Sequence, residues 1–132
     1  MIRPMGTSGP CGGILVVDDD PDIRDSLREV LEDEGYEVAC VGNGREALDH
    51  LKTTNPRPCV ILLDLMMPVM DGQEMLRRLK EDPELSKTPV VVMSAGRVSK
   101  SELQGSRFLA KPFELDDLLE TVTEELDKAQ QA

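Results

Sequence analysis

The chain has 132 residues and a formal net charge of −11 at pH 7, which is enough length for one domain with its own core. Such acidity argues against a nucleic-acid surface, because neutralising phosphates requires clustered lysine and arginine. No apolar run approaches the ~20 residues of a membrane span, so we expect no membrane contact. The acidity suits a site that attracts cations.

The three cysteines Cys11, Cys40 and Cys59 are widely spaced and form no CxxC pair or Cys/His cluster. Neither a zinc site nor a disulfide framework is therefore expected. The first residues contain an arginine but no apolar stretch before "GTSGPCGG", so we do not expect a signal peptide. These features together predict reduced thiols in a cytoplasmic protein.

Short β-type segments alternate with helical patterns from residue 14 onward, after a Gly- and Pro-rich stretch over residues 1–13 that we expect to be a flexible tail. Pro21 suits the first turn of a helix and Gly35 its C-terminal cap. The predicted strands are 14–17, 36–41, 59–63, 89–93 and 107–110. The predicted helices are 21–34, 44–54, a segment around 75–79, and 114–129.

This alternation predicts the α/β class, with a doubly wound parallel sheet covered by helices on both faces. The segment "CVILL" (59–63) is apolar on both sides of a strand, which is typical of a central parallel strand. We predict one domain over residues 14–129 and a C-terminal tail over 130–132. In such sheets the functional crevice lies at the carboxyl ends of the strands.

Polar residues follow four of the predicted strands. The triplet Asp18–Asp20 follows the first strand, Asp64 the third, Ser94 the fourth and Lys111 the fifth. Because parallel strands end at the same edge of the sheet, we expect these side chains to share one rim. Within the triplet, Asp20 stands directly before a proline and is predicted to cap the following helix instead of binding a ligand.

Carboxylates without histidine or cysteine favour Mg²⁺, with Mn²⁺ as the alternative, over zinc. A bound cation would also remove the cost of crowding carboxylates, which otherwise raise one another's pKa. Lys111 adds a positive charge and Ser94 a hydroxyl donor, a combination that suits phosphoryl oxygens. Neither a Walker loop nor a GxGxxG segment follows a strand, so a bound nucleotide is not expected.

Four segments, "VVDDDP", "LLDLMMPVMDG", "VVMSA" and "FLAKPF", closely resemble the receiver domain of two-component response regulators. The resemblance extends over about residues 14 to 129. It implies a flavodoxin-like sheet of five parallel strands in the order 2-1-3-4-5. It also implies a signalling switch in the cytoplasm, not an enzyme, that is a monomer or a weak dimer.

The same resemblance implies specific roles for the rim. Asp64 would accept a phosphoryl group from the histidine of a partner kinase or of a histidine phosphotransfer protein, and the switched domain would contact a downstream protein target. Asp19 would bind Mg²⁺ directly and Asp18 mainly through a water. Asp64 and the backbone carbonyl of Met66 would complete the metal shell.

Three further roles follow from the resemblance. Lys111 would pair with Asp64 and then with the phosphoryl oxygens, and the peptide bond from Lys111 to Pro112 is usually cis in this family. Ser94 would hydrogen-bond the phosphoryl group and draw its loop inward. Phe108 would be the aromatic residue that follows this movement.

The chain departs from the family between Ser94 and Lys111, where the sixteen intervening residues are fewer than receivers usually have. The missing length exceeds one helical turn of ~3.6 residues. It falls in "GRVSKSELQGS", so the fourth helix is predicted to be short or distorted. We therefore expect an unusual output surface and doubt the standard active dimer. Met66 and Gly96, at the two positions flanking the acceptor, cannot orient water, which predicts slow self-dephosphorylation.

Two other classes of function stay open on the sequence. One is a receiver-like adaptor that never uses phosphate, which the intact rim residues argue against. The other is a Mg²⁺-dependent aspartyl phosphatase, which usually needs an Asp-x-Asp pair after the first strand and a cap domain. The only histidine, His50, has no nucleophile partner, so a Ser-His-Asp hydrolase is disfavoured.

Overall fold

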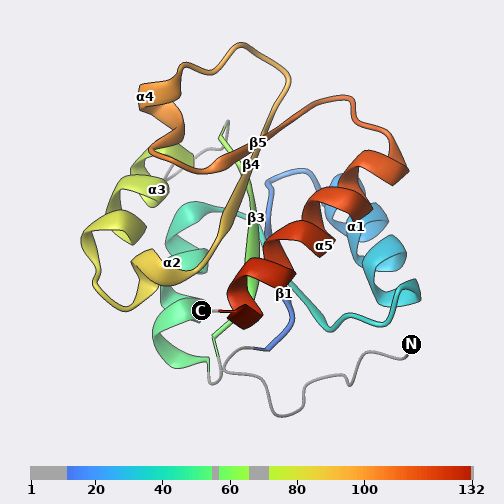
Figure 1. The fold of residues 1–132 in the computed structure, drawn as a ribbon, viewed down its shortest axis with the longest axis horizontal. Helices are drawn as coiled ribbons and strands as arrows, with labels where there is room; N and C mark the ends of the chain where they lie inside the picture. The colour runs from blue at the N-terminus through green and yellow to red at the C-terminus, as the bar shows by residue number, and fades with distance from the viewer. Residues whose placement is uncertain (1–11, 55–56, 66–71, 132) are drawn as a thin grey trace.

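The computed structural model describes residues 12–54, 57–65 and 72–131, the last three without their side chains. Strands and helices alternate through these residues (Figure 1). The strands are β1 (Ile14–Val17), β2 (Val38–Val41), β3 (Val60–Asp64), β4 (Val90–Ser94) and β5 (Arg107–Ala110). The helices are α1 (Pro21–Asp33), α2 (Gly44–Thr53), α3 (Gly72–Glu81), α4 (Lys100–Leu103) and α5 (Leu115–Gln131), with a 3₁₀ turn, η1 (Leu85–Lys87), before β4.

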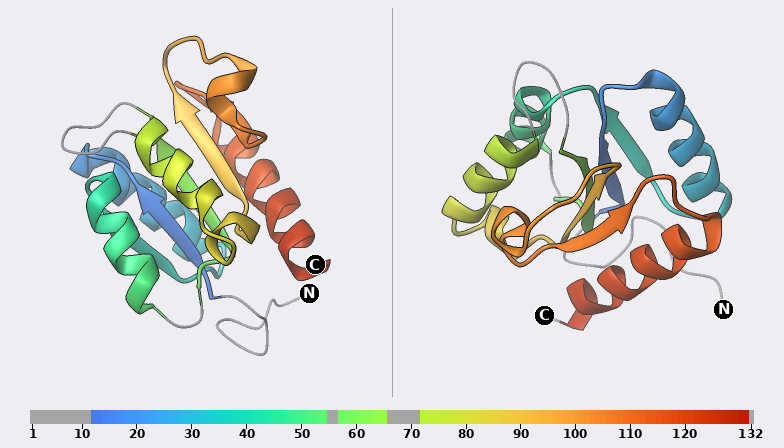
Figure 2. Two further views of the ribbon diagram at one scale, coloured as in Figure 1. Left: turned by 90° about the vertical axis from the view of Figure 1, so that its left-hand side faces the viewer. Right: turned by 90° about the horizontal axis from the view of Figure 1, so that it is seen from above.

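The strands form one parallel sheet in the order β2-β1-β3-β4-β5, which confirms the predicted fold class and strand order. Helices α1 and α5 cover one face of the sheet, and α2 and α3 cover the other (Figure 2). None of the helices in the described residues is long and apolar enough to cross a membrane.

The core consists of two apolar layers, one on each face of the sheet. Leu15 and Leu63 point toward α2 and α3, whereas Val16 and Leu62 point toward α1 and α5, and all four side chains are fully buried. Each buried aliphatic side chain contributes about 1.5–3 kcal/mol relative to exposure. The central strands β1 and β3 are therefore fixed from both sides, and they carry the residues at their carboxyl ends into fixed positions.

Local signals set the ends of the first helix. The carboxylate of Asp20 accepts a hydrogen bond from the backbone N–H of Asp22 at 2.9 Å, so Asp20 is the N-cap that the sequence predicts. Gly35, with φ of +96°, closes the helix. The backbone N–H of Tyr36 donates to the Leu31 carbonyl at 3.1 Å. Because this bond makes Tyr36 part of the helix end, β2 begins at Val38, whereas the sequence predicted a start at Tyr36.

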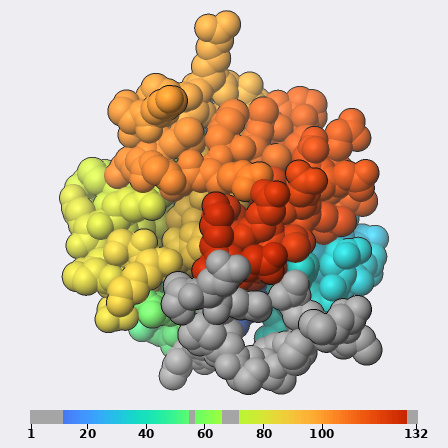
Figure 3. Space-filling model, viewed as in Figure 1, coloured from blue at the N-terminus to red at the C-terminus, as the bar shows by residue number. Residues whose placement is uncertain are grey.

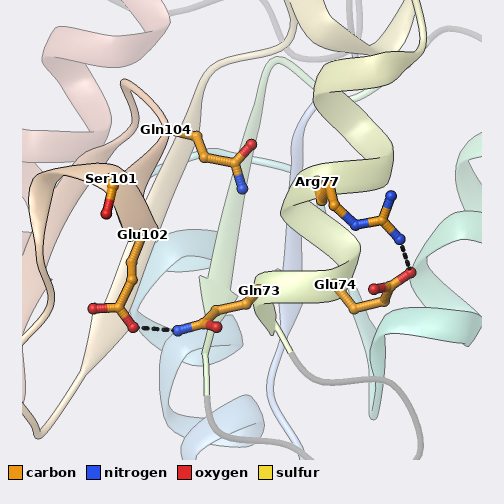
Figure 4. Close-up of a pocket in the computed structure, with 6 residues that line it drawn as sticks. All are labelled: Gln73, Glu74, Arg77, Ser101, Glu102 and Gln104. Carbon is orange, nitrogen blue, oxygen red and sulfur yellow. Dashed lines mark hydrogen bonds and ion pairs between the residues drawn. The ribbon is translucent and has the colours of Figure 1, made fainter.

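The fourth helix is four residues long, and none of its residues is buried, which confirms the predicted shortening. Ser99 and Glu102 form a reciprocal capping box at its start, and Gln104, with φ of 50°, ends it. Its Glu102 carboxylate accepts a hydrogen bond from the Gln73 amide of α3 across a polar hollow of about 400 Å³ (Figure 4). The segment between β4 and α5, orange in Figure 3, stands out at the upper end of the molecule.

The expectation of reduced thiols holds for Cys40, which is a free and half-buried thiol, but it is wrong for Cys59, which is disulfide-bonded. Two backbone hydrogen bonds of 2.7 Å, from Gly12 to Arg57 and from Cys59 to Gly13, hold the segment entering β1 against the segment entering β3. This tertiary pairing brings together parts of the chain that are distant in sequence. Cysteine spacing alone does not reveal it.

Candidate functional site

Asp18 and Asp64 are brought side by side by the register of the two central strands. Val17 of β1 pairs with Leu63 of β3, so the next residue of each strand is an aspartate. Both are buried, with Asp18 fully enclosed and Asp64 only 5% exposed. Two like charges that are shielded from water raise the free energy of the folded state unless a cation or several hydrogen bonds offset them.

A third carboxylate joins this pair. One carboxylate oxygen from each of Asp18, Asp19 and Asp64 lies within 4.8 Å of the other two, and Asp19 faces the solvent. Asp20 is not part of the group. The donor set consists of oxygens alone, which are the ligands of hard divalent cations such as Mg²⁺. The arrangement of these three residues fits the metal that the sequence predicts.

Lys111 supplies the positive charge at this rim. Its Nζ lies 3.0 Å from Asp18 Oδ2 and 3.7 Å from Asp64 Oδ2, and its side chain is 18% exposed. Its backbone N–H donates to the Ser94 carbonyl at 2.9 Å, and the peptide bond to Pro112 is cis. The structure thus brings Lys111 against both buried aspartates, whereas the sequence predicted a pairing with Asp64.

Every polar group of Asp18 has a partner. Its N–H donates to the Val41 carbonyl at 3.2 Å, and its Oδ1 accepts from the backbone N–H of Asp20 at 2.9 Å. Its Oδ2 accepts from Lys111, and its carbonyl accepts from Arg24 Nη1 at 2.7 Å. Asp18 is therefore held firmly in place, whereas Asp19 is an exposed residue whose carboxylate still reaches the other two.

Ser94 and Phe108 lie on the same face of the sheet, on the neighbouring strands β4 and β5. Ser94 is 4% exposed, and its hydroxyl accepts a hydrogen bond from the N–H of Gly96 at 3.1 Å. Val92 pairs with Phe108 in the sheet, so the pleat directs Phe108 and Ser94 to the same side. Phe108 is half-buried against the layer covered by α3. Met66, predicted as a metal ligand and as a residue next to the acceptor, lies outside the described residues.

Gly72 is a site residue that the sequence reasoning missed. Its N–H donates to the Leu65 carbonyl at 3.0 Å, and a Cβ at this position would collide with the Asp64 carbonyl oxygen and the Leu65 Cα. A glycine therefore lets the start of α3 touch the backbone of the buried aspartate. The signal was present in the sequence as the glycine of "LLDLMMPVMDG".

An apolar hollow of about 520 Å³ borders the rim between α1 and the connection from β5 to α5. Lys111 forms part of its wall, so the hollow opens beside the acidic cluster. Its other lining residues are Asp22, Ile23, Ser26, Leu27, Ala95, Pro112 and Phe113.

Comparison with known proteins agrees with this geometry. The family model of the response regulator receiver domain matches residues 14–123. The chain therefore belongs to the response regulator receiver domain family, as its four motifs predict. The response regulator Rre1 of Synechocystis sp. is 37% identical over 125 residues, which cover 90% of this chain and 53% of that protein. The chain thus spans about half the length of the curated relatives it matches.

Solved structures with the same fold are receiver domains as well. The signal receiver domain of a histidine kinase from Syntrophus aciditrophicus is 33% identical, with a TM-score of 0.81 over 92% of this chain and 95% of that one. The receiver domain of a sensor histidine kinase from Pseudomonas aeruginosa PAO1 is 26% identical, with a TM-score of 0.77 over 86% of this chain and 96% of that one. That receiver has a magnesium ion coordinated in its active-site cleft.

Proposed function

We propose that this chain accepts a phosphoryl group on Asp64 from the phosphohistidine of a partner kinase or histidine phosphotransfer protein, with Mg²⁺ present. The adduct then changes its contacts with a downstream protein target. The observation that supports this most directly is the position of the Asp64 carboxylate, buried beside two other carboxylates and 3.7 Å from the Lys111 ammonium.

The transfer needs positioning and charge neutralisation more than covalent chemistry from the protein. A carboxylate oxygen of Asp64 forms the new bond to phosphorus while the phosphorus–nitrogen bond of the donor breaks, and the histidine nitrogen keeps that electron pair. Lys111 offsets negative charge on the phosphoryl oxygens. Asp18, Asp19 and Asp64 would hold the Mg²⁺, for which Mn²⁺ is the alternative, and a bound ion would add positive charge at the same oxygens.

The adduct adds negative charge and acceptor oxygens at the rim. The Ser94 hydroxyl, which accepts from the Gly96 N–H in this structure, would turn to donate to the phosphoryl group. Its loop would move toward Asp64, and Phe108 would follow on the same face of the sheet. Because α4 has no buried residue, a change of shape in the segment between Ser94 and Phe108 would cost little packing in this helix.

The donor has to reach Asp64 from the rim. We propose that the histidine-bearing helix of the partner lies in the apolar hollow beside Lys111, because an apolar helix face would bury the side chains of Ile23 and Phe113 there. In this proposal the chain is a cytoplasmic signalling switch, a monomer or a weak dimer, and not an enzyme with a substrate of its own. It contacts neither nucleic acid nor membrane through this domain.

Incubation with acetyl phosphate and Mg²⁺, followed by intact mass measurement, tests the proposal. We expect one labile phosphoryl group on the wild type and on Asp49→Asn, a control that changes an exposed aspartate of α2. We expect none on Asp64→Asn. Absence of an adduct and of beryllofluoride binding in the wild type would favour the phosphorylation-independent adaptor. Turnover of phosphate esters would favour an aspartyl phosphatase.

A further inference from the structure

Arg24 reaches from the first turn of α1 back to the end of β1. Its Nη1 donates a hydrogen bond of 2.7 Å to the backbone carbonyl of Asp18, and its side chain is half-buried. A carbonyl that accepts from a guanidinium has a charge-assisted bond, stronger than an ordinary backbone hydrogen bond. Arg24 is therefore fixed on the backbone of the acidic loop and not on one of its carboxylates.

The carbonyl in question belongs to the peptide unit that joins Asp18 to Asp19. Asp18 is already held through its N–H and both carboxylate oxygens, so its side chain does not depend on Arg24. Asp19 is exposed, and its Cα follows directly from the peptide unit that Arg24 holds. Fixing the plane of this peptide therefore sets the direction in which the Asp19 carboxylate leaves the backbone.

The guanidinium also lies over the turn that follows β2. A Cβ on Gly42 would stand 3.2 Å from Arg24 Nη1 and 3.6 Å from Glu46 Oε1, so both charged groups lie close to the same point. Glu46 Oε1 in turn accepts from the Gly42 N–H at 2.9 Å. The Glu46 carboxylate thus offsets part of the Arg24 charge, which lowers the repulsion between Arg24 and a cation at the acidic rim.

We propose that Arg24 is a positioning residue for the cation site: it holds the Asp18–Asp19 peptide so that the Asp19 carboxylate points at the ion, and through this it supports phosphorylation of Asp64. The inference rests on the proposed function. Two effects of removing Arg24 have opposite signs, because losing a positive charge strengthens cation binding whereas losing the fixed peptide weakens it. Groups that orient metal ligands typically affect metal affinity by about 10- to 100-fold, so we expect the positioning effect to be larger.

The test is the dissociation constant of Mg²⁺ alone, measured by calorimetry on the full chain. Arg24→Ala should weaken Mg²⁺ binding by about tenfold. Arg28→Ala is the matched control, because it removes the same charge from an exposed position one turn further along α1, and it should leave the affinity unchanged or slightly raised. Arg24→Lys keeps the charge without the planar fork and should give an intermediate affinity.

An unchanged or lower Mg²⁺ dissociation constant in Arg24→Ala would overturn the proposal. A purely electrostatic role predicts this result, because losing a positive charge strengthens cation binding. If Arg24→Ala does not fold, as judged by circular dichroism, the Mg²⁺ affinity of Arg24→Lys is compared with that of Arg28→Lys. Weaker Mg²⁺ binding by Arg24→Lys supports the proposal, and equal binding by the two variants overturns it. A second readout is the Mg²⁺ concentration that gives half-maximal phosphorylation by acetyl phosphate, which should rise while the maximal rate changes little. A wild type that neither binds Mg²⁺ nor forms an adduct would reject the proposed function itself.

Discussion

Lys111 lies closer to Asp18 than to Asp64: its Nζ is 3.0 Å from Asp18 Oδ2 and 3.7 Å from Asp64 Oδ2. The register of β1 and β3 places these two buried carboxylates side by side, and a single ammonium lies against both. In this state the Lys111 ammonium offsets the charge of the two carboxylates, so Lys111 has a role before any phosphoryl group is present. The nearness to Asp18 leaves Lys111 able to move toward new oxygens on Asp64 without losing a carboxylate partner.

Replacing this lysine should make the fold depend on added cation. In Lys111→Met the acidic rim loses its positive partner, and we expect the free energy of unfolding in EDTA to fall by about 3 kcal/mol, as measured by urea denaturation. Mg²⁺ should then stabilise the variant more than the wild type, because it replaces the missing charge.

Lys128→Met serves as the control for this change. It removes an ion pair to Glu125 from a lysine side chain that is 65% exposed, and we expect a loss of less than about 1 kcal/mol. Equal losses in the two variants, or an equal response to Mg²⁺, would contradict the role of Lys111 as the internal cation.

A side chain at position 72 should displace the backbone that carries the acceptor Asp64. In Gly72→Ala the new Cβ meets the Asp64 carbonyl oxygen and the Leu65 Cα, so the start of α3 has to move away from the end of β3. We expect a loss of about 1–3 kcal/mol in the free energy of unfolding and a slower reaction with acetyl phosphate. The control Gly96→Ala puts its Cβ no closer than 3.9 Å to Ser94 Oγ, and it should leave stability within about 0.5 kcal/mol. A harmless Gly72→Ala would show that the close contact is not needed.

Asp20 should behave as a helix cap and not as a metal ligand. Asp20→Ala removes the acceptor of the Asp22 N–H and should lower the free energy of unfolding by about 1 kcal/mol. Asp20→Ser keeps a capping oxygen and should restore most of that stability. Both variants should retain wild-type Mg²⁺ affinity in calorimetry. Loss of Mg²⁺ binding in Asp20→Ser would instead make Asp20 a ligand.

The thiol of Cys40 should react slowly at neutral pH. Burial raises the pKa of this thiol above its ordinary value of 9.0, although Arg28 and Arg24 nearby lower it. The thiol therefore stays protonated to a higher pH in the folded protein. Its contribution to stability is fully present below the pKa of the unfolded thiol, and it is lost as pH rises through the pKa of the folded one.

Peptide mapping after alkylation with iodoacetamide under non-reducing conditions measures this shift. The pH at which Cys40 reacts at half its maximal rate should be higher in the native protein than in urea. A native midpoint at or below the urea value would contradict the effect of burial.

Sequence patterns were sufficient for the features that depend on local or nearest-neighbour rules. Alternating apolar segments predicted the doubly wound parallel sheet, and strand ends predicted the shared rim of Asp18, Asp64 and Lys111. The strand order came from the resemblance of the four motifs to receiver domains. The shortened interval after Ser94 predicted a short or distorted fourth helix, and α4 has four residues. The position of Asp20 before a proline predicted its cap, because N-capping depends only on residues within one turn.

The features that the sequence did not reveal depend on tertiary approach. Arg24 acts on a carbonyl six residues earlier, and only the packing of α1 against the sheet brings the two together. The glycine at position 72 was visible in its motif, but the reason for it was not, because only the structure shows the backbone of Asp64 and Leu65 lying against it. The spacing of the cysteines likewise did not reveal that Cys59 is disulfide-bonded.

The central claim, that Asp64 is the phosphoryl acceptor, is tested most directly by locating the modification. The protein is treated with acetyl phosphate and Mg²⁺, digested at acidic pH, and the peptides carrying Asp18, Asp19 and Asp64 are sequenced by tandem mass spectrometry. The account predicts the phosphoryl group on Asp64 alone, and its absence when EDTA is present. A phosphoryl group on Asp18 or Asp19, or equal modification with EDTA, would contradict it.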